Sequence, residues 1–121
     1  MTDLRYKTAI VGASETTLLG EIPHLSEFQL HVDASLNAIN DCGIERNQID
    51  GVATTMNPAA LGHYLGIKPN WVDNTQVGGT SFLMHVRHAA AAIAAGLCTT
   101  VLVSMAQSGR SRVGEMGPRI G

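Results

Sequence analysis

The sequence predicts an α/β fold with a mainly parallel β-sheet. Two observations support this prediction: short apolar runs alternate with segments of helical periodicity, and cap or turn residues stand at most of the boundaries between them. Strands that alternate with helices are typical of βαβ units, in which the strands run parallel. The chain has 13 glycines and only 4% aromatic residues, so we expect a core in which helices approach the sheet closely.

Composition limits the class of protein. The 121 residues have the length of one domain, and an apolar fraction of 45% is enough for a core. A formal net charge of −2 gives no attraction for nucleic acid or an anionic membrane. No apolar run approaches the ~20 residues of a spanning helix and no secretory signal is recognised, so we expect a cytoplasmic protein. Residues 1–107 are predicted to form the domain, and 108–121 a flexible tail containing glycine and arginine.

The first predicted elements are a strand, a loop and a long helix. Lys7–Gly12 is a short apolar run that predicts a buried strand, and Ala13–Pro23 is rich in turn formers. Ser26 and Gln29 fit a capping box, and Gly43 stands where a left-handed helix stop belongs, so a helix is expected between them. Its buried stripe is expected to consist of four apolar residues at helical spacing, Phe28, Val32, Leu36 and Ile39.

The middle of the chain predicts two short strands on either side of a short helix. The strands are Ile49–Thr54 and Asn70–Asn74. The helix is Pro58–Leu65, with Asn57 as its cap and proline at its first position. Gln76–Gly79 then predicts a tight loop.

An alanine-rich helix is the most informative predicted element. It spans Thr80–Ala95 and ends at Gly96, and Thr99–Ala106 follows as an apolar strand. Six alanines, Ala89–Ala92, Ala94 and Ala95, place small residues around its circumference, and after Ser81 only Arg87 and two histidines interrupt the apolar sequence. A surface helix would keep a polar stripe, so we expect this helix to be buried on most sides.

Two hydroxyl side chains mark the start of this helix as a candidate site. Thr80 and Ser81 follow two glycines, where the amide groups of the first helical turn favour an anion or a developing oxyanion. Either residue could then be a nucleophile or an oxyanion-binding group. The alternative interpretation is a plain helix N-cap, which is a common use of Thr and Ser.

The histidines and cysteines predict no metal site. His85 and His88 are three positions apart and could share a helix face, but no further ligand has a recognisable spacing, so packed histidines bonded to the backbone are expected. The other histidines, His24, His31 and His63, are expected to face solvent or to act as caps. Both cysteines, Cys42 and Cys98, are expected to be reduced packing residues.

Together these residues resemble the N-terminal half of the thiolase superfamily. The strand Lys7–Gly12, the helix from Ser26 and the run Ile49-Asp50-Gly51-Val52 follow the order of that half. The stretch Val72–Ser111 is a more specific match, because it is similar to the buried nucleophile helix of thiolases and the strand after it. The most similar members are the lipid-transfer-protein-like thiolases, often described as acetyl-CoA acetyltransferases.

The resemblance implies an acyl-CoA acyltransferase that forms or breaks carbon–carbon bonds. A coenzyme A thioester is then the substrate, and no separate cofactor is expected. Thiolases carry a nucleophilic cysteine at the start of the alanine-rich helix. Counting back from Gly96 places its equivalent at Gly79 or Thr80, whereas alignment from Val72-Asp73 places it at Gln76. Thr80 is the preferred equivalent, with Ser81 beside it. The substrate is expected to contact the preceding loop at Gln76, Gly78 and Gly79.

The missing cysteine leaves two alternatives open. Thiolase-like members without it include retro-aldolases that act on coenzyme A thioesters. The chain, which resembles only an N-terminal fragment of a thiolase subunit, could instead be a non-catalytic subunit that dimerises or holds a partner. The resemblance implies a homodimer or larger assembly, with a small zinc-ribbon/OB-fold protein as a possible partner.

Overall fold

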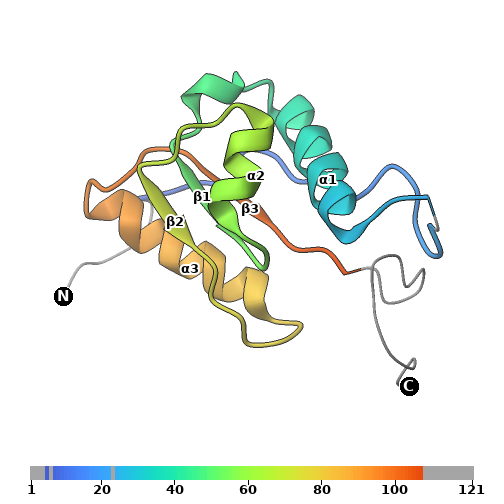
Figure 1. Ribbon diagram of the computed structural model, residues 1–121. Helices are drawn as coiled ribbons and strands as arrows, with labels where there is room; N and C mark the ends of the chain where they lie inside the picture. The colour runs from blue at the N-terminus through green and yellow to red at the C-terminus, as the bar shows by residue number, and fades with distance from the viewer. Residues whose placement is uncertain (1–4, 6, 23, 108–121) are drawn as a thin grey trace.

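The computed structural model describes residues 5, 7–22 and 24–107. The predicted tail, 108–121, lies outside the described residues. Helices and strands alternate along the chain from residue 27 onward (Figure 1). The elements are α1 (Glu27–Cys42), a short 3-10 helix η1 (Arg46–Gln48), β1 (Gly51–Thr54), α2 (Pro58–Leu65), β2 (Trp71–Asp73), α3 (Ser81–Ala94) and β3 (Val101–Ser104).

The sheet has three parallel strands in the order β2-β1-β3, which confirms the predicted fold class. Gly51 pairs with Trp71 on one side and with Val101 on the other. The chain moves outward from β1 to β2 and then back across β1 to β3. Two crossover connections of the same handedness that run in opposite directions along a sheet place their helices on opposite faces of that sheet. Accordingly α1 and α2 cover one face of the sheet, and α3 covers the other (Figure 1).

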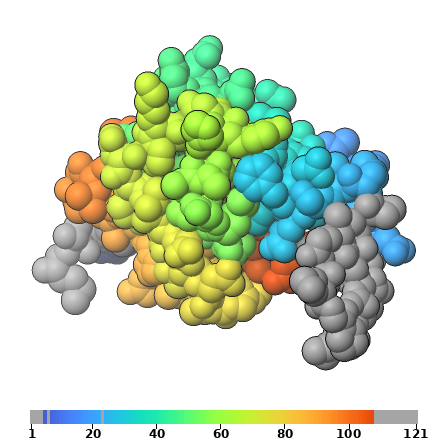
Figure 2. Space-filling model, in the orientation of Figure 1, coloured from blue at the N-terminus to red at the C-terminus, as the bar shows by residue number. Residues whose placement is uncertain are grey.

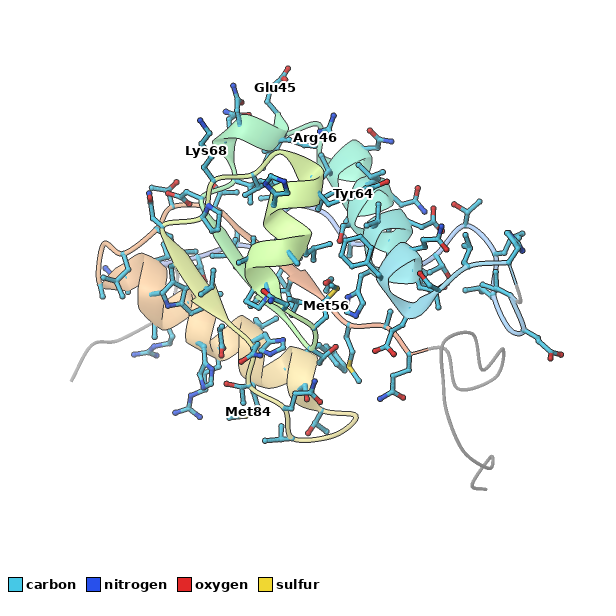
Figure 3. The ribbon with its side chains drawn as sticks, viewed as in Figure 1. Glu45, Arg46, Met56, Tyr64, Lys68 and Met84 are labelled. Carbon is cyan, nitrogen blue, oxygen red and sulfur yellow. The ribbon has the colours of Figure 1, made fainter. Side chains whose placement is uncertain are left out.

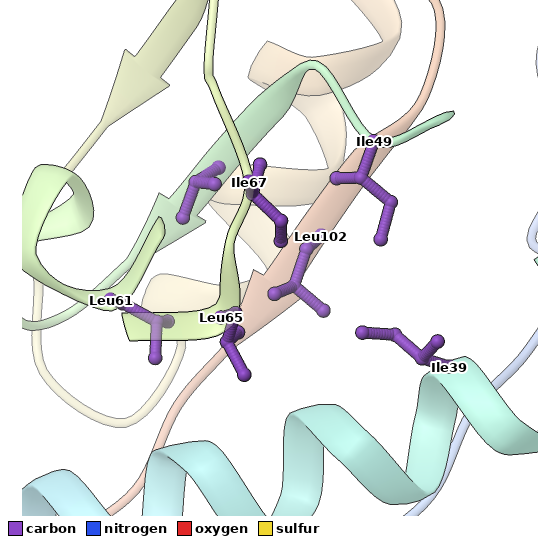
Figure 4. Packing of buried hydrophobic residues seen from close by; sticks show 7 residues of the cluster. Ile39, Ile49, Leu61, Leu65, Ile67 and Leu102 are labelled. Atoms are coloured by element: carbon purple, nitrogen blue, oxygen red, sulfur yellow. The ribbon is translucent and has the colours of Figure 1, made fainter. Parts of the chain in front are cut away.

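The main hydrophobic core lies between the sheet and the layer of α1 and α2 (Figure 4). Leu61 and Leu65 point from α2 toward the sheet and are almost completely buried. Each such side chain contributes about 1.5–3 kcal/mol when it leaves water. The buried members of this core are Ile39, Ile49, Val52, Leu61, Leu65, Ile67 and Leu102.

Helix α1 has the predicted ends but a different buried face. Ser26 accepts a hydrogen bond from the Gln29 amide, the Gln29 side chain accepts one from the Ser26 amide, and Gly43 adopts a left-handed conformation. Of the predicted stripe only Ile39 is fully buried. The helix is rotated so that its other buried residues are Leu30, His31 and Ser35. Two polar residues therefore replace apolar ones on the buried face, and His31 has hydrogen-bond partners on the strands.

The prediction of a strand at Lys7–Gly12 is wrong. No strand forms there within the described residues, and Ile10 and Val11 are 77% and 60% exposed. The apolar pattern is that of a strand, but a strand also needs a hydrogen-bonded neighbour. Gly12 instead lies against α1, where an added Cβ would come within 2.8 Å of the Ala38 carbonyl oxygen.

Helix α3 forms where it was predicted, but the expectation that it is buried on most sides is wrong. One stripe faces the sheet and is buried, namely Ser81, His85, Ala89 and Ala92. Phe82 and Leu83 remain 44% and 57% exposed, because the sheet is the one layer packed on this helix in the described structure. No helix among the described residues combines the length and apolar character needed to cross a membrane.

Candidate functional site

The carboxyl edge of the sheet brings together strand ends and helix starts. Thr54 ends β1, Asp73 ends β2 and Ser104 ends β3. Helices α2 and α3 both begin at this edge, so the positive ends of their dipoles lie near the strand ends. In Figure 3, Met56 and Met84 lie toward this edge, whereas the charged residues Glu45, Arg46 and Lys68 lie at the other end of the molecule.

The predicted nucleophile positions differ in their surroundings. Thr80 is exposed at the N-cap of α3, and its side chain makes no capping hydrogen bond in the described part of the chain. Ser81 is fully buried, and its hydroxyl accepts a hydrogen bond from the Val77 amide at 2.9 Å and donates one to the Gly78 carbonyl at 2.7 Å. The Ser81 hydroxyl therefore closes the loop, and the Thr80 hydroxyl is the accessible one.

The predicted substrate-binding residues share the exposed loop before α3 (Figure 2, yellow). The Gln76 side chain donates a hydrogen bond to the Thr55 carbonyl, which ties the loop to the end of β1. Gly78 has a φ of 84°, a conformation that favours glycine, whereas Gly79 has open space where a Cβ would stand. The structure thus brings these residues together, and their contact with substrate stays a prediction.

The two histidines of α3 bind different partners. His85 is buried, and its Nε2 lies 2.9 Å from the Thr75 carbonyl oxygen, as predicted for a packed histidine. The Nδ1 of His88 lies 2.6 Å from a carboxylate oxygen of Asp73. Burial acts to raise the pKa of Asp73, but hydrogen bonds from Thr75 and His88 outweigh it and hold the pKa below its usual value. The described residues hold no group of three or more potential metal ligands.

A cavity of about 690 Å³ opens between α1, the end of β3 and the start of α3. Of the predicted site residues, Gly79 lines it, together with Phe82 from the first turn of α3. The rest of the wall consists of uncharged residues: Gly12, Ala13, Ser14, Ala34, Ser35, Ala38, Val103, Ser104, Met105, Ala106 and Gln107. Its volume is in the range of small-molecule sites.

A buried polar cluster stands behind one wall of this cavity. The Nδ1 of His31 lies 2.8 Å from the Ser104 hydroxyl and 3.3 Å from the Thr54 hydroxyl, and those two hydroxyls are 2.9 Å apart. His31 was expected to face solvent or to act as a cap, and that expectation is wrong because the ring is fully buried against β1 and β3. Burial lowers the pKa of His31 to about 4, so the ring is neutral at neutral pH.

Two polar atoms on the inner face of α1 have no hydrogen-bond partner among the described residues. They are the Nε2 of His31 and the hydroxyl of Ser35. The residues are four positions apart and therefore lie one helical turn from each other. A buried polar group without a hydrogen-bond partner lowers the stability of the fold by about 1–3 kcal/mol, so a ligand that bonds either atom would bind favourably there.

Sequence reasoning missed this buried cluster. The available signal was a polar pair at positions 31 and 35, at the spacing of one helix face, on a helix that packs against an apolar strand run. Ser104 stands inside that run, TTVLVSMA. The apolar stripe of α1 is one position out of phase with this pair, so the stripe predicted that the neighbouring face of the helix would be buried.

Comparisons with known proteins support the resemblance at the level of the fold. No family model matches the chain, and no curated protein matches it. A solved structure named Ltp2-ChsH2(DUF35) aldolase matches with a TM-score of 0.69 and 28% identity, over 90% of this chain and 31% of that chain. A monomeric SCP2-thiolase-like protein type 1 from Mycobacterium smegmatis matches with a TM-score of 0.71 and 27% identity. This chain resembles part of a thiolase-like protein.

The chain covers only a fraction of the matched structures. The alignment to the Mycobacterium smegmatis thiolase-like protein takes in 97% of this chain but 27% of that one. The likeness therefore concerns one region of a larger fold, in which helices flank a parallel sheet.

Proposed function

We propose that this chain is part of an enzyme that forms or breaks a carbon–carbon bond in an acyl-coenzyme A thioester, by a retro-aldol reaction in preference to thiolysis. The observation behind this proposal is the missing cysteine at the start of α3. Residues 76–81 are Gln-Val-Gly-Gly-Thr-Ser, so no thiol can take up an acyl group there. The likeness to a structure named as an aldolase supports the same choice.

Neither cysteine of the chain can replace the missing thiol. Cys42 lies in the last turn of α1, where its sulfur donates to the Ile39 carbonyl. Cys98 is buried between α3 and β3, and burial, followed by the charge of Asp50, raises the pKa of its thiol. A raised pKa keeps the thiol protonated, whereas the thiolate is the nucleophile.

The start of α3 suits a reaction in which negative charge develops on a thioester. In retro-aldol cleavage, a base removes the proton of the 3-hydroxyl group, the bond between C2 and C3 breaks, and its electron pair forms a thioester enolate. The enolate then takes up a proton at C2 to give the shorter acyl-coenzyme A. Amide groups at a helix N-terminus stabilise such charge. In this proposal the Thr80 hydroxyl adjoins the reacting group, Ser81 fixes the loop, and Gln76, Gly78 and Gly79 shape the substrate contact.

The need for free coenzyme A distinguishes the two reactions. Retro-aldol cleavage of a 3-hydroxyacyl-coenzyme A gives a carbonyl compound and a shorter acyl-coenzyme A with no added thiol. Thiolysis of acetoacetyl-coenzyme A requires one free coenzyme A for each turnover. We expect the full-length enzyme that contains this chain to release a carbonyl compound in the first assay and to show no thiolysis in the second, as followed by mass spectrometry. Thiolysis without retro-aldol cleavage would overturn the choice, and inactivity in both would overturn the proposal.

The Thr80 variant tests the site itself. We expect Thr80→Ala to lower the retro-aldol rate at least about tenfold, since one aligned hydrogen bond in a transition state is worth at least that much. Thr100→Ala is the matched control, because Thr100 lies at the opposite, amino-terminal edge of the sheet. Equal rates for the two variants would remove Thr80 from the site.

A partner surface is the second part of the proposal. Four apolar side chains on α3 are exposed, and we refer to them as the outer face of α3: Phe82, Leu83, Met84 and Val86. Contiguous exposed apolar residues mark interaction sites in soluble proteins. A homodimer or larger assembly would cover this face. A small zinc-ribbon/OB-fold protein is the alternative, since one matched structure is named with a DUF35 component.

A further inference from the structure

Ser104 and His31 have the geometry of a nucleophile and its base. The Ser104 hydroxyl oxygen lies 2.8 Å from the Nδ1 of His31, and Ser104 lines the 690 Å³ cavity. This separation is within the range for proton transfer from a serine to a histidine. We propose that Ser104 is a second reactive site of this chain, which takes up the acyl group of a small uncharged ester or thioester with His31 as its base.

The hydrogen bonds around His31 fit this assignment. The Ser104 hydroxyl donates a hydrogen bond to the Thr54 hydroxyl at 2.9 Å. Because a hydroxyl hydrogen rotates to suit its partners, it can turn toward the Nδ1 of His31, which lies 2.8 Å from the same oxygen. Thr54 in turn accepts a hydrogen bond from the Met56 amide at 3.4 Å, which holds it in place.

Ser35 supplies the group that an acyl transfer needs beside the nucleophile. Its hydroxyl is buried and has no hydrogen-bond partner among the described residues, and Ser35 is one of the residues that line the same cavity as Ser104. It lies one helical turn from His31. A donor held at the cavity wall can bond the oxyanion that forms when an acyl carbon becomes tetrahedral. Ser35 is therefore the oxyanion-binding residue of this proposal.

The cavity lining indicates the class of substrate. Every residue that lines it is uncharged, and Gly12, Ala13, Ala34 and Ala38 leave space along α1. A charged acyl group would lose its hydration there without gaining a partner, which is costly. Short uncharged acyl groups are the expected ligands.

The reaction balances without any added oxidant, reductant or metal. The Ser104 oxygen forms a bond to the acyl carbon, and its proton passes to the Nδ1 of His31. The bond from the acyl carbon to the leaving oxygen or sulfur breaks, and the leaving group takes the proton from His31. Water then attacks the acyl-serine, His31 again carries the proton, and the products are a carboxylic acid and free Ser104.

An active-site label tests this site independently of coenzyme A. We would treat the full chain with an alkyl phosphonofluoridate, locate the adduct by peptide mass spectrometry and measure its rate of formation. We expect one adduct, on Ser104, and a rate at least about 100-fold lower in His31→Gln, as the loss of a general base predicts. Ser14→Ala is the matched control, because Ser14 lines the same cavity and lies outside the His31 cluster.

Each outcome decides the proposal. Labelling of several serines at equal rates, no adduct on Ser104, or unchanged labelling in a folded His31→Gln variant would overturn it. Circular dichroism establishes whether each variant is folded. If His31→Gln does not fold, Ser104→Cys serves instead: the introduced thiol should react with iodoacetamide faster than Cys42, and an unreactive thiol in a folded chain would overturn the proposal. Labelling without retro-aldol activity would sustain this site and reject the function proposed above.

Discussion

At the residue scale, the adjacent hydroxyls of Thr80 and Ser81 have different roles: that of Ser81 is structural, and that of Thr80 is accessible. The Ser81 hydroxyl is buried and makes two hydrogen bonds within the loop. Thr80 is exposed, and among the described residues its side chain makes no capping hydrogen bond to the helix. We expect Ser81→Ala to lower the free energy of unfolding by about 1–2 kcal/mol, because the Val77 amide and the Gly78 carbonyl both lose their hydrogen-bond partner. Thr80→Ala should change it by less than about 0.5 kcal/mol. Urea denaturation measures both, and equal losses would contradict this division.

His31 gives the chain a defined response to acid. Its pKa is about 4 in the folded state, against 6.5 for the unperturbed side chain. Between these values the unfolded chain binds the proton and the folded chain does not, so stability falls as the pH falls. The contribution is complete above pH 6.5, and the slope approaches about 1.4 kcal/mol per pH unit inside the window.

Urea denaturation at several pH values measures this slope, and His31→Gln is the control. The wild-type chain should lose stability between pH 6.5 and about 4 more steeply than the variant, which has no titrating group at this position. Parallel curves for the two proteins would show that His31 is not held neutral by burial.

At the scale of elements, the run Ile49-Asp50-Gly51 connects the start of β1 to the start of β3, at the amino-terminal edge of the sheet. The Asp50 carboxylate accepts hydrogen bonds from the Thr99 and Thr100 amides at 2.9 Å each. Burial acts to raise the pKa of Asp50, but these hydrogen bonds outweigh it and lower the pKa. Gly51 is needed because an added Cβ would come within 2.9 Å of the Val101 side chain. These two residues set how closely β1 and β3 pair.

The loop before α3 distinguishes two adjacent glycines. Gly78 has a φ of 84°, where a Cβ is strained, and Gly79 does not have a positive φ. We expect Gly78→Ala to lower the free energy of unfolding by about 1–2 kcal/mol. Gly79→Ala is the matched control and should be close to neutral, because nothing lies within 4 Å of its added Cβ. Thermal denaturation compares the two, and a greater loss for Gly79→Ala would show that the loop has another conformation.

At the scale of the whole molecule, the outer face of α3 predicts association. We expect the average mass of the full chain in sedimentation experiments to rise with concentration. Leu83→Glu should reduce that rise, because a charge on an apolar interface is costly to bury. Leu19→Glu is the control, since Leu19 is also exposed but lies in the loop before α1. A monomer at all concentrations, or equal effects of the two variants, would contradict the prediction.

Local signals determined the elements of this chain. Ser26 with Gln29, Asn57 with Pro58, and the glycines that follow each helix are short-range patterns, and the helices begin and end at them. The alternation of these elements was enough to predict a parallel sheet, because parallel strands need crossover connections. The loop from Gln76 was likewise visible, since glycine pairs mark turns on their own.

Tertiary structure decided which face each element buries. Among the described residues no strand pairs with the apolar run at Lys7–Gly12, so its strand pattern produced no strand. In the described part of the chain only the sheet packs against helix α3, so apolar residues on its other faces are exposed although its composition suits burial. The cluster of His31 and Ser104 joins positions 73 residues apart. The spacing of apolar residues shows which face of a helix or strand is apolar, but only the tertiary structure determines what packs against that face.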